Sequence, residues 1–98
     1  MERADVVIIG AGAVGTAIAR ELSRYRLKVI VCDKNEDVGG DASKSCSSCV
    51  ATAATMPTGT LEQQLRSISH PMVFDICRDL DIPIEKCGSL TVAITDDQ

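Results

Sequence analysis

The sequence predicts an α/β fold from three features near its beginning. Four successive β-branched residues, Val6–Ile9, form a strand that is apolar on both faces, as in a parallel sheet covered by helices. A glycine-rich segment ends this run, and from Ala13 to about Arg24 the apolar residues recur at helical spacing. Leu27–Cys32 is a second apolar strand. With 98 residues, the chain has room for one domain at most.

The remainder of the chain predicts helices and a short β-hairpin. Thr60 is a candidate cap for a helix that begins at Leu61, with Gln63 as its capping-box partner. Pro71 is expected to kink or break this helix, because proline lacks the backbone donor and clashes with the preceding turn. Two short strands, 82–86 and 90–94, are expected to form the hairpin. Such a sheet would leave apolar faces uncovered, so we expect an incomplete domain spanning residues 1–98.

Composition excludes several functional classes. The chain is 45% hydrophobic and 24% charged, with a net charge of −4, which is typical of a globular protein and argues against nucleic-acid binding. No apolar run is long enough to span a bilayer. The first residues resemble neither a signal peptide nor a lipidation site, so we expect a cytoplasmic protein; contact with the inner face of a membrane stays open. The only aromatic residues are Tyr25 and Phe74, which fits a core that is only partly present.

The segment from Gly10 to Gly15 has the GxGxxG spacing of a Rossmann-like dinucleotide-binding unit. Gly10 permits a tight turn, Gly12 lets a pyrophosphate approach the backbone, and Gly15 lets the helix pack on the strand. Asp33 ends the second strand, where a carboxylate binds ribose hydroxyls. No arginine follows it, which disfavours NADP. The motif does not separate FAD from NAD, and the weaker alternative is that these glycines serve only a strand–helix turn.

The five cysteines are odd in number and follow no secretory signal, so we expect reduced thiols and no disulfide framework. Cys32 and Cys77 are interpreted as small buried apolar residues. For Cys46 and Cys49, incidental small residues are the favoured interpretation, followed by a redox pair and then by half of a metal site. No metal site is predicted. His70, the only histidine, is expected to be a surface residue.

Residues 5–15, 19–23 and 29–34 resemble the beginning of FAD-dependent oxidoreductases. Within them, the chain is most similar to the glycerol-3-phosphate dehydrogenase and L-2-hydroxyglutarate oxidase group of the D-amino-acid-oxidase-like family, and the segments 36–39, 59–61 and 80–90 extend the similarity. The resemblance implies FAD as cofactor and places Ser43 and Lys44 near the flavin. The expected cofactor-binding residues are therefore Gly10, Ala11, Gly12, Ala13, Val14, Gly15, Asp33, Lys34, Ser43 and Lys44.

The chain departs from this family after Lys44. Where the family has asparagine, glycine, histidine and a second glycine, this sequence has Cys46, Ser48, Ala51 and Ala53. The loss of a histidine near the flavin puts catalysis in doubt, so no catalytic residue is carried over from the family.

These observations predict the FAD-binding portion of a flavoprotein oxidoreductase that acts on CH–OH donors and resembles glycerol-3-phosphate dehydrogenase. Its substrate would be a 2-hydroxy acid or glycerol 3-phosphate, and the catalytic groups are expected beyond Gln98. The chain alone is expected to bind weakly and to catalyse nothing. One alternative is a small nucleotide-binding subunit whose sheet a partner chain completes; another is an inactive truncated remnant.

Overall fold

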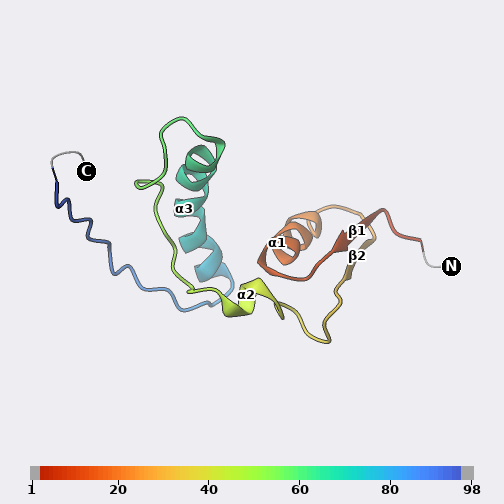
Figure 1. The fold of residues 1–98 in the computed structure, drawn as a ribbon. Helices are drawn as coiled ribbons and strands as arrows, with labels where there is room; N and C mark the ends of the chain where they lie inside the picture. Colours follow the sequence, from red (N-terminus) through yellow and green to blue (C-terminus); the bar gives the residue numbers. More distant parts are fainter. Residues whose placement is uncertain (1–2, 96–98) are drawn as a thin grey trace. The chain divides into compact units, whose positions relative to one another are not determined.

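The computed structural model describes residues 3–95 and divides them into two compact units, one up to Cys49 and one from Val50 onward. The first unit contains β1 (Val6–Ile9), α1 (Ala13–Leu22), β2 (Val29–Cys32) and the short α2 (Ala42–Ser45), and the second contains α3 (Leu61–Asp79) (Figure 1). The expected domain 1–98 also includes residues 1, 2 and 96–98, which lie outside the described part.

The first unit is the predicted strand–helix–strand arrangement. β1 and β2 pair in parallel, with Val6 opposite Val29 and Ile9 opposite Cys32, and α1 connects them. β2 begins two residues later than predicted. α1 ends at Leu22, and Ser23 follows it as the C-cap, with its backbone N–H still donating to the Ala19 carbonyl. The α/β fold predicted from the sequence is confirmed.

The core of the first unit lies between β1 and α1. Ile8 is only 9% exposed to solvent and Ala11 only 5%, and the side chain of Ile8 faces the helix. On the other face of β1, Val7 is 56% exposed and Ile9 is 92% exposed. The alternation follows from the two-residue period of a strand. It confirms the expectation that this sheet leaves an apolar face uncovered.

In the second unit, α3 runs through Pro71 without interruption, so the predicted break at this proline is wrong. Pro71 deprives the Ser67 carbonyl of its usual donor, but Ser67 is exposed and water can replace that donor. The predicted cap is confirmed, since the Thr60 Oγ1 accepts from the Gln63 N–H at 3.2 Å. Among the described residues, no helix is long and apolar enough to cross a bilayer.

Residues 82–94 contain no strand, so the predicted β-hairpin is wrong. Its start is tied to the helix instead: the Ile82 N–H donates to the Cys77 carbonyl at 2.8 Å, and the Lys86 ammonium lies 4.3 Å from the centre of the Phe74 ring. Leu90 and Ile94 are 90% and 86% exposed. The alternating pattern alone does not stabilise a strand, because pairing requires a neighbouring strand and a surface that buries its apolar side.

Candidate functional site

The loop from Gly10 to Gly15 joins β1 to α1, and its conformation requires glycine at two positions. Gly10 has a φ of +106°, and its N–H donates to the Cys32 carbonyl at 2.7 Å, which holds the loop to the end of β2. A Cβ atom at Gly15 would overlap the carbonyl oxygen of Gly10 and lie 3.3 Å from the Ile8 Cγ2. The turn and packing roles predicted for these glycines are confirmed, whereas their contact with a cofactor stays a prediction.

The first turn of α1 presents a backbone donor to an oxygen atom from another helix. The Ala13 N–H donates to the Ser43 Oγ at 2.8 Å, so α2 brings its hydroxyl to the N-terminus of α1. A Cβ atom at Gly12 would lie 3.0 Å from the same oxygen. Lys44 follows Ser43 on α2 and is exposed. The structure therefore brings Ser43, which the resemblance alone had indicated, to the glycine loop.

Asp33 holds the same loop from the end of β2. Its Oδ2 accepts from the Ala11 N–H at 2.6 Å, and its Oδ1 accepts from the Asn35 N–H at 2.8 Å. These hydrogen bonds, that from Ala11 first, lower the pKa of Asp33 below its ordinary value because they stabilise the charged carboxylate. Each oxygen keeps a second lone pair, so the carboxylate can still accept hydrogen bonds from a ligand.

Lys34, beside Asp33, is engaged within the protein. Its Nζ lies 3.0 Å from the Asp41 Oδ2, and this contact raises the pKa of Lys34 above the ordinary lysine value. The sequence analysis did not identify Asp41 or Asn35 as site residues. The position of Asn35 could have been found, because a carboxylate commonly accepts from the backbone N–H two residues later in a turn. Asp41 carries no comparable local signal.

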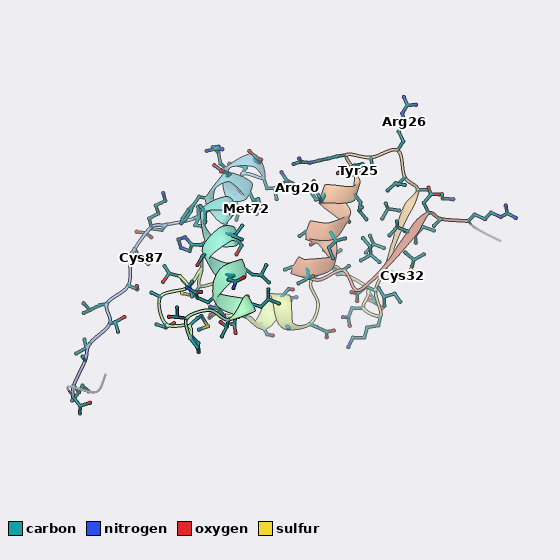
Figure 2. The ribbon with its side chains drawn as sticks, turned by 90° about the horizontal axis from the view of Figure 1, so that it is seen from above. Arg20, Tyr25, Arg26, Cys32, Met72 and Cys87 are labelled. Carbon is teal, nitrogen blue, oxygen red and sulfur yellow. The ribbon has the colours of Figure 1, made fainter. Side chains whose placement is uncertain are left out.

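Two hollows meet at Asp33, at the carboxyl ends of the strands. One has a volume of about 340 Å³ and is lined by Ala11, Thr16, Val31, Asp33, Asn35, Glu36, Asp37 and Val38. The other, of about 240 Å³, is lined by Ile9, Gly10, Cys32, Asp33, Lys34 and Asp41. Figure 2 shows Cys32 at this end of β2, with Arg26 near the opposite end of the strands. Ligands of open parallel sheets bind at this edge.

Ser48, which stands where the resembled family has glycine, has a backbone conformation that favours glycine. Its φ is +55°, in the left-handed region that L residues seldom adopt. Glycine would adopt this backbone conformation without the steric cost that serine bears. Nearby, Cys46 follows α2 as its C-cap, and its thiol donates to the Ser43 carbonyl at 3.3 Å.

The class of protein follows from this arrangement: a parallel βαβ unit with a glycine loop, an exposed helix N-terminus and an acidic residue after β2 defines a dinucleotide-binding domain. Residues 5–98 match the family of FAD dependent oxidoreductases, and the chain belongs to that family. The family implies FAD as the cofactor.

Three relatives illustrate the similarity. The chain is 40% identical over 94 residues to a glycerol 3-phosphate dehydrogenase of Caloramator mitchellensis, a match that covers 96% of this chain and 20% of that protein. It is 35% identical to a mitochondrial L-2-hydroxyglutarate dehydrogenase of Arabidopsis thaliana, over 94% of this chain and 19% of the relative. A glycerol 3-phosphate oxidase of Mycoplasma pneumoniae is 40% identical, and the match covers 98% of this chain and 25% of that protein.

The chain thus spans about a fifth to a quarter of the length of these relatives. No solved structure matches it.

Proposed function

We propose that this chain is the portion of a flavoprotein oxidoreductase that binds the ADP moiety of FAD. The observation that carries the proposal is Asp33, whose carboxylate receives the Ala11 N–H of the glycine loop at 2.6 Å and lines both hollows at the strand ends. A carboxylate in this position accepts hydrogen bonds from ribose hydroxyls.

The donors at α1 fit a pyrophosphate. The Ala13 N–H donates to the Ser43 Oγ at 2.8 Å, and a phosphate oxygen can accept from this N–H once the Ser43 hydroxyl turns to donate to the same phosphate. The helix N-terminus adds a partial positive charge and further backbone N–H groups. Gly12 carries no side chain that would fill this space, and in our proposal Ser43 contacts the phosphate with its hydroxyl. Val14 on α1 and Lys44 on α2 belong to the proposed set of cofactor-binding residues because they directly follow Ala13 and Ser43 in the sequence.

The charges at the site favour an unmodified ribose. Asp33 is ionised at neutral pH, as an aspartate ordinarily is, and its hydrogen bonds lower its pKa further; Glu36 and Asp37 line the same hollow. The ammonium of Lys34 pairs with Asp41. A ribose 2′-phosphate would therefore meet negative charge, which argues against NADP.

When bound, FAD would supply the group that accepts a hydride from the substrate. The relatives are named as dehydrogenases or oxidases of glycerol 3-phosphate and L-2-hydroxyglutarate, so we propose a CH–OH donor of this kind for the whole flavoprotein. In this chain, the residues act by binding and orienting the cofactor.

A titration of the purified chain with FAD tests the proposal, with flavin absorbance and fluorescence as readouts. We expect saturable binding that ADP displaces, and no flavin reduction when glycerol 3-phosphate or an L-2-hydroxy acid is added. Displacement by ADP tests the ADP moiety as the part that this chain recognises. Absence of saturable binding, or binding that ADP does not displace, would contradict the proposal.

A further inference from the structure

The segment that joins β2 to α2 (Figure 1) has an ion pair between its two ends. The Lys34 Nζ, at the β2 end, lies 3.0 Å from the Asp41 Oδ2, at the α2 end. The same two ends also approach each other beside this pair, because a Cβ atom at Gly40 would lie 3.0 Å from the Asn35 Nδ2. Both charged residues line the smaller hollow together with Asp33. The ion pair therefore closes a loop at the edge of the proposed FAD site.

Both ends of this loop hold the glycine loop. On the lysine side, Asp33 accepts from the Ala11 N–H at 2.6 Å. On the aspartate side, the Gly39 N–H donates to the Ala11 carbonyl at 2.9 Å, and the Ser43 Oγ accepts from the Ala13 N–H at 2.8 Å. An ion pair that holds the two sides together therefore fixes these three contacts relative to one another.

The position of Ser43 depends on such contacts because α2 is too short to be stable by itself. It has four residues, whereas isolated helices shorter than about 12–15 residues are marginal in water. Asp41 is the N-cap of α2, but its side chain makes no capping hydrogen bond, and its carboxylate pairs with Lys34 instead. The Asp41 side chain thus connects α2 to the end of β2.

We propose that Asp41 is a positioning residue for FAD binding: through its ion pair with Lys34, it holds α2 where Ser43 reaches the N-terminus of α1. This inference rests on the proposed function and adds to it a residue that need not contact the cofactor. Charge alone predicts the opposite effect of Asp41, because removal of a carboxylate from the site favours an anionic cofactor. The direction in which FAD affinity changes therefore separates positioning from charge.

Amide hydrogen exchange of the full chain without FAD tests the positioning itself. Asp41→Asn removes the charge with little change in size. We expect the Ala13 and Gly39 N–H groups to exchange about two- to fivefold faster in this variant, as the loss of an exposed ion pair implies. The Gly10 N–H, which donates to the Cys32 carbonyl at 2.7 Å, is the internal reference and should keep its rate. Unchanged rates at Ala13 and Gly39, or equal acceleration of all three groups, would overturn the proposal.

Titration with FAD at low ionic strength tests the consequence for binding. Asp41→Asn and Lys34→Gln should each weaken binding about two- to fivefold, and the double variant should be no weaker than the weaker single variant, because both changes remove the same ion pair. Glu21→Gln is the matched control. It removes the acid of another exposed ion pair of the first unit, with Arg24 at 3.5 Å, and should leave the affinity unaltered.

Tighter binding of FAD by Asp41→Asn, or additive losses in the double variant, would contradict the positioning role. Failure of this inference is distinguishable from failure of the proposed function. Absence of FAD binding by the unaltered chain contradicts the proposed function, whereas the exchange rates test the effect of the ion pair without FAD.

Discussion

The two units of this chain differ in how far along the sequence the hydrogen bonds between polar side chains and the backbone reach. In the first unit, Asp33 reaches back 22 residues to Ala11, and the Ser43 hydroxyl contacts the backbone N–H 30 residues earlier. In the second unit, the Thr60 cap contacts the backbone three residues later, and Gln63 reaches back only four. Long-range contacts gather distant residues at one point, whereas local contacts stabilise a helix. The comparison explains why the candidate binding site lies in the first unit.

Neither unit owes its organisation to a large core. Ile8 and Ala11 are the buried residues that the structure describes in the first unit, and Cys77 is the one in the second. The first unit nevertheless positions its site, because backbone groups at two strand ends and short side chains are sufficient to place the donors and the carboxylate.

The largest expected effect comes from Gly15→Ala. Its methyl group would overlap the Gly10 carbonyl oxygen, so α1 must move away from β1. We expect a loss of about 3 kcal/mol in the free energy of unfolding, measured by urea denaturation, together with loss of FAD binding.

Gly59→Ala is the matched control in the second unit. Gly59 has a positive φ of +83°, which L residues seldom adopt, but a Cβ atom there would meet nothing within 4 Å. The change should cost about 1 kcal/mol and leave FAD affinity unaltered. If both variants lost FAD binding equally, the site would not be confined to the first unit.

Thr60→Ala removes the cap of α3 and should cost about 1 kcal/mol, because the Gln63 N–H loses its acceptor. Helical circular dichroism and urea denaturation measure the effect. The affinity for FAD should remain that of the unaltered chain, and a weakened affinity would show that the units are not independent in binding.

Ser48→Gly should stabilise the first unit slightly, by about 0.5 kcal/mol. Glycine adopts the left-handed conformation without the steric cost that serine bears, although it gains entropy in the unfolded chain. Urea denaturation of Ser48→Gly and of Ser47→Gly separates the relieved steric cost from the entropy of the unfolded chain. Both variants gain the entropy, whereas only Ser48→Gly relieves a positive φ. Equal changes in the two variants would contradict this account.

Acidification should weaken the first unit through Asp33. Its folded pKa lies below the ordinary value of 3.8, so the stabilisation is fully present above that pH and is lost as the pH falls through the lower folded value. Asp33→Asn lacks this dependence. Urea midpoints measured from about pH 5 downward should therefore fall more steeply for the unaltered chain than for the variant. Parallel curves would refute the assignment.

The sequence predicted the βαβ unit well because each of its signals is local: β-branched runs, glycines at fixed spacing and a carboxylate after a strand. It failed at Pro71, where Ser67 is exposed and water can replace the missing donor to its carbonyl, which reduces the penalty of proline. It also failed at 82–94, where alternation predicts a strand but pairing depends on a neighbour. In the site, Asp41 was missed because its contact with Lys34 depends on the path of the loop between them.

The affinity of Asp33→Ala for FAD, measured beside that of Asp5→Ala, tests the central claim most directly. The two aspartates make similar contacts at opposite ends of the same strands, since the Asp5 Oδ2 accepts from the Lys28 N–H at 2.7 Å. We expect Asp33→Ala to weaken binding by about tenfold to a hundredfold, as charge-assisted hydrogen bonds to ribose are lost. Asp5→Ala should bind FAD as the unaltered chain does. Equal affinities of the two variants would contradict the proposed site.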